Sequence, residues 1–469
     1  MKSIRKTLTL YRRIKHHHLM LKRLLYFSFA FFSKRKRRYA RRFTGAGLLV
    51  LSALVASAVV GLDTTQTIAY QIFTFLLFLF LGSMVWGFFF RARFSVERKL
   101  PRFGTVGERL HYRVIVENLT RKRQTGLNLL ENLESFLPTF DEFLSAPEPD
   151  QRRRNPVDRA IGYHRWQWLL SRKQGVRLRE QSVPPIAPAG KAEVRVEMVP
   201  TRRGHLRWAG LTIACPDPLG LFKAFYGISA PQSVLILPRR YPLPPIELPG
   251  TRRYQPGGVS LASSVGDSQE FLSMRDYRPG DPLRLIHWRS WAKTGKPVVK
   301  EYQDEFFVRH ALILDTFQTV EYSERFEEAV SVASSFVSTM ETQETLLDLM
   351  FVGTEAYCFT SGRGLASTDK MLEILASVTA CRDKPFSVLP PTVLARASML
   401  SGCICVLLTW DEKRQELISN LNALGVPLLV LVVTDSTTPQ ALDPGPMKGS
   451  PRNLVQLQIG KIQEGLAQL

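Results

Sequence analysis

The stretch Val308–Asp315, VRHALILD, is an apolar run that ends in an acidic residue. It opens an alternation of segments with helical spacing and short apolar runs, at residues 322–340, 346–352, 369–380, 402–409, 412–424 and 426–433. Strands that alternate with helices favour a parallel sheet covered on both faces. We therefore expect an α/β domain over residues 306–469.

The preceding part of the chain has the two-residue period of β-strands. Arg109–Glu117 and Ala192–Met198 alternate apolar and polar residues, and Gly and Pro residues punctuate the runs between them. Short alternating strands with frequent turns predict an antiparallel β-sandwich over residues 94–237. Within it, residues 145–155 are expected to form a polar loop. The segment Asp217–Phe222, DPLGLF, is expected to form a turn with an apolar anchor that closes the sandwich.

Two uncharged apolar runs lie closer to the N-terminus, at Gly45–Leu62 and Ile68–Phe90. Each can cross a hydrocarbon layer about 30 Å thick. We expect a two-helix transmembrane hairpin within residues 43–93. A basic cluster precedes the first run, four more basic residues follow the second, and the connecting loop has none, so both termini are expected in the cytoplasm. The cytoplasmic membrane of a bacterium is the expected location.

The net charge of +22 is concentrated at the N-terminus. Residues 1–42 hold 15 Lys or Arg and no acidic residue. This segment is expected to be a basic cytoplasmic tail with an interfacial helix at Leu19–Phe32. A basic tail beside a membrane span favours anionic lipid as its partner and disfavours nucleic acid.

Five cysteines, Cys215, Cys358, Cys381, Cys403 and Cys405, show no C-x-x-C spacing. Cys403 and Cys405 share one face of a strand, where a disulfide between them would be strained. We expect reduced thiols, as in a reducing compartment.

Residues 238–305 are expected to combine an extended linker, Pro238–Gly258, with a dense charged segment. That segment contains YRPGDPLRLIHWRSWAKTGKPVVKEY. Asp281 is a good helix N-cap, Pro282 suits the first helical position and Gly295 suits the residue after the helix, so a helix is expected over Asp281–Lys293. The charges predict either a salt-bridge network joining this segment to the α/β domain or a surface for a partner or ligand. The candidate interaction residues are Arg275, Tyr277, Arg278, Gly280, Asp281, Arg284, His287, Trp288, Lys293 and Glu301.

The run Gly266–Glu301 closely resembles the signature of the bacterial family called domain of unknown function 58. Asp217–Phe222 and the paired apolar runs also resemble the family, whereas the long basic tail does not. The resemblance implies a C-terminal domain similar to a von Willebrand factor A domain. It also implies work with a MoxR-type AAA+ ATPase, and with a transglutaminase-like membrane protein.

A von Willebrand A domain carries Mg²⁺ on a D-x-S-x-S loop after its first strand, where oxygen ligands suit a hard cation. The matching positions are Asp315, Phe317 and Thr319, with Asp411 as a second carboxylate. Phe317 has no ligand atom, which damages the motif. The alternative is that Asp315 and Asp411 cap the helices that follow them.

The function expected from these features is that of a membrane-anchored cytoplasmic adaptor or scaffold, with no enzymatic activity. It would serve the assembly or maturation of membrane or envelope proteins. The alternatives are a metal-dependent ligand-binding module and an uncharacterised hydrolase. The sequence lacks G-x-S-x-G, H-E-x-x-H and a phosphate-binding G-x-x-x-x-G-K, which counts against the common hydrolase classes.

Overall fold

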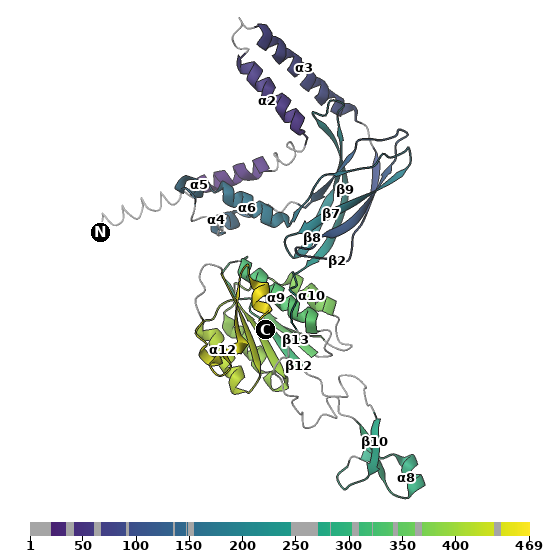
Figure 1. Ribbon diagram of the computed structural model, residues 1–469, viewed down its shortest axis with the longest axis vertical. Helices are drawn as coiled ribbons and strands as arrows, with labels where there is room; N and C mark the ends of the chain where they lie inside the picture. The colour runs from purple at the N-terminus through teal and green to yellow at the C-terminus, as the bar shows by residue number, and fades with distance from the viewer. Residues whose placement is uncertain are drawn as a thin grey trace, which may run out of the picture. The chain divides into compact units, whose positions relative to one another are not determined.

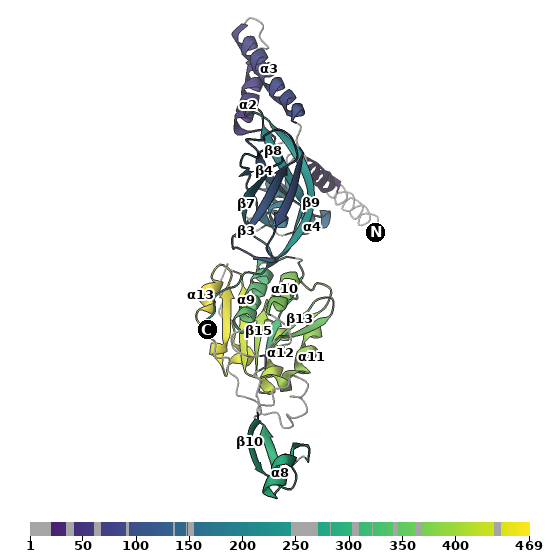
Figure 2. The ribbon, with the colours of Figure 1, turned by 90° about the vertical axis from the view of Figure 1, so that its right-hand side faces the viewer.

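The chain is described from a computed structural model, drawn in Figure 1 and turned by 90° in Figure 2. The structure describes residues 20–33, 42–60, 67–90, 93–134, 137–146, 148, 154–244, 271–281, 283–302, 309–320, 322–340, 346–361, 368–435 and 442–469. They belong to two compact units, Met1–Arg239 and Arg240–Leu469. Each unit has a hydrophobic core of its own.

Two apolar helices, α2 (Gly45–Val60) and α3 (Thr67–Phe89), lie side by side in the first unit (Figure 1). Within α3, Ile68–Gly87 is long and apolar enough to cross a membrane, with a mean hydropathy of 2.0. Helix α2 has 16 residues, fewer than the roughly 20 that a span needs. The described residues thus hold one candidate span where the sequence predicted two. The connection at 61–66 lies outside the described residues.

Two β-sheets follow the helix pair and share one core (Figure 2). The four-stranded sheet has the order β1 (Phe94–Lys99), β3 (Leu110–Asn118), β7 (Lys191–Pro200) and β5 (Val176–Arg177). The five-stranded sheet has the order β2 (Phe103–Thr105), β9 (Lys223–Leu237), β8 (Gly204–Pro216), β4 (Asn128–Leu133) and β6 (Gln181–Ser182). In β3 and β7 alternate residues are buried, as the two-residue period predicted.

A helical insertion interrupts the strands between β4 and β5, where the sequence predicted only strands and a polar loop. It consists of α4 (Phe140–Ser145), α5 (Pro156–Ile161) and α6 (Tyr163–Gln174). Trp166 and Leu169 of α6 are buried together with Phe143 of α4. The helix of residues 20–33 adds Tyr26 and Phe29 to the same cluster. Contacts distant in sequence therefore stabilise helices that local periodicity does not reveal.

The turn at Asp217–Phe222 joins β8 to β9. Its buried Asp217 carboxylate accepts hydrogen bonds from the backbone N–H groups of Leu219, Leu221 and Phe222 at 3.2, 2.7 and 2.8 Å. The backbone N–H of Thr44 donates to the Leu221 carbonyl at 3.2 Å. A Cβ at Gly47 would lie 2.1 Å from that carbonyl oxygen, so only glycine fits there. The turn is thus bonded to the start of α2.

A buried ion pair joins the two β-sheets. The Arg98 guanidinium of β1 donates to the Glu131 carboxylate of β4 at 2.7 and 3.1 Å, and both side chains are at most 3% exposed. Tyr112 donates to Glu131 at 3.1 Å, and Gln232 accepts from Arg98 at 3.1 Å. Burial, and then the Glu131 charge, raises the pKa of Tyr112, so its hydroxyl remains a donor. Both charges are hydrogen-bonded, as a pair inside a core requires.

Replacing Arg98→Ala should lower the free energy of unfolding by about 3–5 kcal/mol, because the Glu131 carboxylate would remain buried without its partner. The matched control is Arg113→Ala, which breaks an exposed pair with Glu193 at 3.4 Å and should cost less than about 1 kcal/mol. Thermal unfolding of the full chain in detergent measures both. Equal losses of unfolding free energy in Arg98→Ala and Arg113→Ala would contradict the interpretation that the buried Arg98–Glu131 pair stabilises the core.

The second unit is built on a six-stranded sheet covered by helices on both faces (Figure 2). The strand order is β14 (Ala356–Ser361), β13 (Leu346–Val352), β12 (Arg309–Leu314), β15 (Gly402–Leu407), β16 (Leu428–Thr434) and β17 (Leu454–Gln458). The α-helices are α9 (Glu324–Met340), α10 (Thr368–Ser377), α11 (Leu389–Leu394), α12 (Glu412–Ala423) and α13 (Ile462–Leu466). Short 3₁₀ turns lie at Phe386–Val388, Ala397–Met399, Gly445–Met447 and Pro451–Asn453. The predicted parallel α/β sheet is confirmed, with β14 as an antiparallel edge.

The beginning of the predicted linker is packed against the second unit. Tyr241 is buried, its backbone N–H donates to the Ser335 hydroxyl at 2.8 Å, and its own hydroxyl donates to Glu328 at 2.6 Å. The Gln463 amide donates to the Pro242 carbonyl at 3.0 Å. Residues 238–244 are therefore not a free linker, and residues 245–258 lie outside the described residues.

The five cysteines are free thiols, as predicted. Cys381, Cys403 and Cys405 are buried, whereas Cys215 and Cys358 are half-buried. The Sγ atoms of Cys403 and Cys405 lie 3.6 Å apart on one face of β15. Cys403 and Cys405 therefore pack in the core as small apolar side chains.

The signature segment folds as a β-hairpin with a short helix. Strand β10 (Phe271–Asp276) pairs antiparallel with β11 (Val298–Tyr302), and α8 (Trp288–Thr294) lies between them in the chain. The helix predicted over Asp281–Lys293 was wrong in its start. A 3₁₀ turn, Leu283–Leu285, comes first, and α8 begins after His287 because Asp281 binds Arg275 rather than capping a helix. The predicted end of the helix was right, because Gly295 follows α8 in the left-handed conformation with φ +69°.

Candidate functional site

The order of the strands reverses between β12 and β15 in the second unit. The chain passes from β12 to its neighbour β13 on one side, and from β15 to its neighbour β16 on the other. Open α/β sheets bind ligands at the carboxyl ends of the strands at such a point. Asp315 directly follows β12, and Leu408 directly follows β15. This edge of the sheet is the first candidate site.

The Asp315 carboxylate is fully buried and accepts four hydrogen bonds from the protein. The backbone N–H groups of Phe317 and Leu408 donate to it at 3.0 Å each. The Arg414 guanidinium donates through Nε at 2.6 Å and through Nη2 at 3.1 Å. Both carboxylate oxygens are therefore engaged by groups of the chain itself.

Arg414 comes from the first turn of α12 and is 6% exposed. Its Nη1 donates to Asp411 at 2.6 Å, and Asp411 caps α12 by accepting from the Arg414 backbone N–H at 3.1 Å. The guanidinium also lies 4.6 Å from the ring centroid of Phe386. Burial by itself would lower the pKa of Arg414, but the bonds and charge of Asp315 outweigh it and raise that pKa. The site thus holds a permanent internal cation.

The predicted Mg²⁺ ligands do not form a metal site. Phe317 is buried and packs edge-on against Phe386, while Thr319 is exposed. Mg²⁺ requires an octahedral shell of oxygens, and Arg414 occupies the space between Asp315 and Asp411. No group of three or more His, Cys, Asp or Glu that could hold a metal occurs in the described part of the chain. The residues present do not fit the metal that the resemblance implied.

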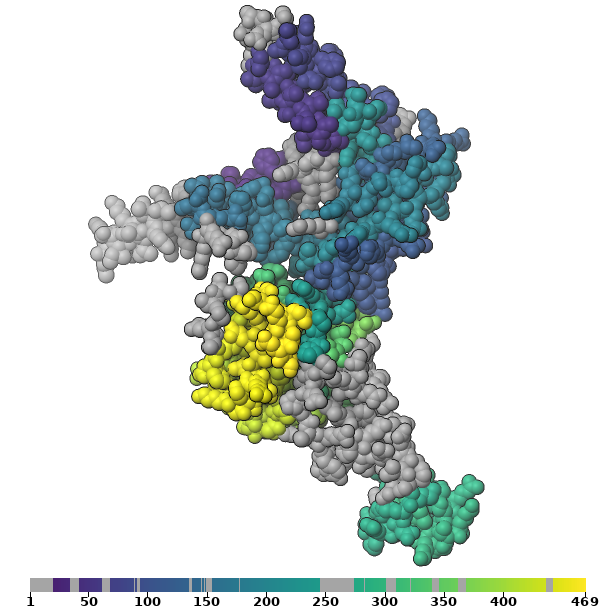
Figure 3. Space-filling view, viewed as in Figure 1, coloured from purple at the N-terminus to yellow at the C-terminus, as the bar shows by residue number. Residues whose placement is uncertain are grey.

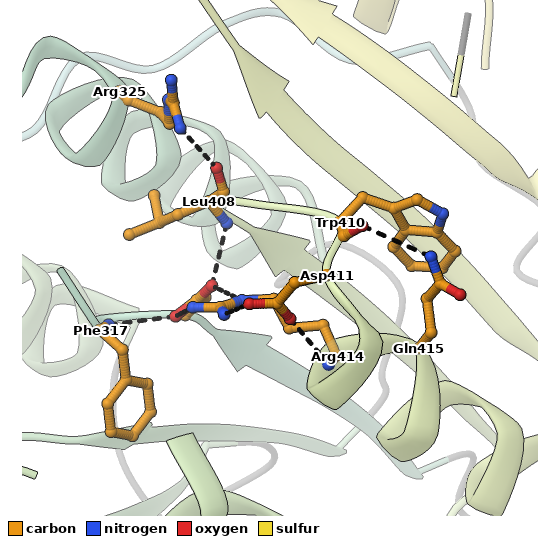
Figure 4. A network of polar contacts seen from close by, with 8 residues as sticks. Phe317, Arg325, Leu408, Trp410, Asp411, Arg414 and Gln415 are labelled. Carbon is orange, nitrogen blue, oxygen red and sulfur yellow. Dashed lines mark hydrogen bonds and ion pairs between the residues drawn. The ribbon is translucent and has the colours of Figure 1, made fainter. Parts of the chain in front are cut away.

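Arg414→Ala should lower the free energy of unfolding by about 3–5 kcal/mol, because Asp315 would remain buried without a counter-charge. Removing both charges in Arg414→Ala with Asp315→Ala should recover part of the loss. The control is Arg325→Ala at the same sheet edge, where Arg325 donates to the Leu408 carbonyl at 3.1 Å and is more exposed (Figure 4). Melting temperatures of the full chain measure all three. Added Mg²⁺ should leave the wild-type value unchanged, and a rise abolished by Asp315→Ala would contradict the internal-cation reading.

The second candidate site is the signature module, defined as the described residues within 271–302. In Figure 3 these residues, in green, form a compact group of atoms. Arg275 donates to Asp281 through both terminal nitrogens, at 2.7 and 2.8 Å, and the Arg278 backbone N–H donates to the same carboxylate at 2.8 Å. Gly280, with φ +107°, permits the turn between them. This bidentate ion pair therefore fixes the turn that follows β10.

The module exposes both apolar and basic side chains. Trp288 is 64% exposed and stacks on Trp291 with ring centroids 5.2 Å apart, and Leu283 is 67% exposed. The sequence from Leu283 to Lys300 contains no acidic residue, and its exposed basic residues are Arg284, Arg289, Lys293 and Lys296. Aromatic and arginine side chains are the residues that most often carry protein–protein binding.

The remaining signature residues support the backbone of the module. The Tyr277 backbone N–H donates to the Pro297 carbonyl at 2.9 Å, and Glu301 lies opposite Ser273 in the hairpin. His287 Nδ1 lies 2.7 Å from the Ser290 hydroxyl. His287 is the residue that precedes α8. The Ser290 hydroxyl also lies 3.3 Å from the sulfur of Met274 in β10.

Hydrogen bonds from Arg275 and from the Arg278 backbone lower the pKa of Asp281 to about 2 from an ordinary 3.8. Because the pKa in the folded state is depressed, the pair is fully formed above pH 3.8 and is lost as the pH falls through about 2. We expect a ¹³C titration of Asp281 in the full chain to show a midpoint near 2, assigned by Asp281→Asn. Arg275→Gln should move it back toward 3.8. A wild-type midpoint near 3.8 would show that the pair does not form.

Comparison with known families places this module. Residues 273–399 match the family described as "Protein of unknown function DUF58". The chain carries a DUF58 family domain. The match starts within β10 and ends at Met399, so the DUF58 segment includes the signature module and β12 to β14, but not Asp411 or Arg414.

A homologue is the "Uncharacterized protein YeaD" of Bacillus subtilis (strain 168), 27% identical over 184 residues. The match covers 38% of this chain and 44% of that protein, so the chain spans less than half of the relative's length. Among solved structures, the solution structure of the CARDB domain of PF1109 from Pyrococcus furiosus is 12% identical and covers 31% of this chain and 94% of that domain. The crystal structure of that domain with di-metal ions is 13% identical and covers 32% and 91%. Both have a TM-score of 0.17, too low to relate the folds.

Sequence reasoning found Asp315 and Asp411 but missed Arg414, which joins them. The position of Arg414 in the sequence was a usable signal. A basic residue in the first turn of a helix interacts unfavourably with the helix dipole, which indicates that a carboxylate lies nearby. It also missed the buried Arg98–Glu131 pair, whose members lie 33 positions apart on different strands. No local pattern encodes such a pairing.

Proposed function

We propose that the chain is a membrane-anchored cytoplasmic adaptor or scaffold and not an enzyme. The observation that carries this proposal is the signature module, which exposes Trp288 and Leu283 among basic side chains. Isolated apolar residues on a surface are common, but a stacked tryptophan pair within a segment rich in exposed arginine and lysine has the composition of a binding hot spot. At the sheet edge, in contrast, the Asp315 carboxylate is buried and bonded to Arg414, which also binds Asp411.

The proposed anchor is the α2–α3 pair, with two spans in a bacterial cytoplasmic membrane and both termini in the cytoplasm. Support comes from the apolar character of both helices and from basic residues at both outer ends. The basic segment at residues 1–42 would contact anionic lipid rather than nucleic acid. On this arrangement the β-sheets, as an antiparallel sandwich, and the α/β domain lie in the cytoplasm.

The second unit is proposed to be von Willebrand A-like. Its strand order, with an antiparallel edge strand and an acidic residue after the first strand, supports this. The proposed partner is a MoxR-type AAA+ ATPase with an acidic docking surface, and a transglutaminase-like membrane protein is a further candidate. The process served would be assembly or maturation of membrane or envelope proteins.

The test measures binding of the full chain, in detergent or nanodiscs, to a purified MoxR-type ATPase from the same organism. Trp288→Ala should weaken binding by about tenfold or more, since truncating a hot-spot residue costs roughly 2 kcal/mol. The matched control is Leu424→Ala, another exposed apolar residue outside the module, which should leave the affinity unchanged. Equal affinity of wild type and Trp288→Ala, or no binding by wild type, would refute the proposal.

A further inference from the structure

The helix of residues 20–33 has two different apolar faces. Its outer face exposes six large side chains, each more than half exposed: Met20, Leu21, Leu24, Phe27, Phe31 and Phe32. They recur at intervals of three and four residues, which forms a continuous stripe along one side of a helix. A stripe of this size in contact with water is costly, so it calls for a covering partner.

The inner face of the same helix is fixed to the helical insertion of the β-sheet unit. Tyr26 contacts the Trp166 ring edge-on with centroids 5.5 Å apart, and its hydroxyl donates to the Pro138 carbonyl at 3.0 Å. The Trp166 Nε1–H donates to the Ser33 hydroxyl at 2.7 Å. Phe29 packs against Phe143 in the same cluster. Figure 1 shows the helix, in purple, beside α6. The outer stripe is therefore held by the folded unit and not by a free tail.

Charge and chain length indicate what covers the stripe. The nine residues after it, 34–42, include seven Lys or Arg, and residues 1–42 contain no acidic residue. An apolar stripe next to a dense basic segment complements the acyl chains and the anionic headgroups of a phospholipid bilayer. Ser33 and Gly45, the first residue of α2, are twelve positions apart, so at roughly 3.6 Å per residue they lie within about 43 Å of each other.

We propose that the helix of residues 20–33 is a lipid-contact surface that holds the β-sheet unit against an anionic bilayer through the Tyr26–Trp166 cluster. This inference rests on the proposed membrane anchoring and adds a second point of attachment to it. Helices α2 and α3 fix the chain in the membrane, whereas the outer stripe fixes how the folded unit lies on it. The stripe inserts to the depth of the headgroups because its inner face is already occupied.

The test places a photo-crosslinker in the full chain, reconstituted in nanodiscs with and without anionic phospholipid. Phe27→p-benzoylphenylalanine and Phe31→p-benzoylphenylalanine report on the outer stripe. Phe78→p-benzoylphenylalanine, at a 74% exposed position of α3, reports on the anchor. The negative control is Val199→p-benzoylphenylalanine, an exposed position at the end of β7 that lies away from α3. Mass spectrometry identifies what each position captures.

We expect phospholipid adducts at positions 27, 31 and 78 and none at 199, with the yield at 27 and 31 falling when anionic lipid is left out. Lipid adducts at 78 but not at 27 or 31, or adducts there with a second copy of the chain, would overturn the inference and leave the anchor standing. Absence of lipid adducts at 78 as well would overturn the anchor, and the inference with it.

Discussion

The structure of the second unit depends on one buried ion pair, between the Asp315 carboxylate and the Arg414 guanidinium. Asp315 ends the central strand of the six-stranded sheet, where it is shielded from water and close to the backbone of the neighbouring strand. A charge in that position requires a partner, and Arg414 supplies it from the first turn of α12. The loop after β12, the end of β15 and the start of α12 are thereby tied to one point. The geometry of the whole sheet edge depends on that pair.

The Asp315–Arg414 pair also affects which parts of the second unit could bind a ligand or a partner. At the edge of the α/β sheet, the guanidinium of Arg414 takes up the Asp315 carboxylate that a bound ion would need. Within the DUF58 segment, the signature module holds the bidentate Arg275–Asp281 pair and the stacked tryptophans Trp288 and Trp291.

Features decided by neighbours in sequence were predictable, and those decided by distant partners were not. The strand Leu346–Val352 was predicted with its full length, because a continuous apolar run needs no partner to be recognised. Gly295 was placed correctly after α8 because a left-handed residue there favours glycine. Asp281 was misassigned as a helix cap, since its bond to Arg275 depends on the hairpin. The helices around Trp166 were missed because their apolar partners include residues more than a hundred positions earlier.

The close approach of Gly47 to the Leu221 carbonyl limits which residues position 47 can accept. A methyl group at position 47 would meet that oxygen at 2.1 Å, so no other side chain is accommodated without moving the helix or the turn. A larger side chain there would strain the junction that bonds the start of α2 to the turn after β8. The junction thus restricts position 47 to glycine by its geometry, whatever the polarity of the side chain.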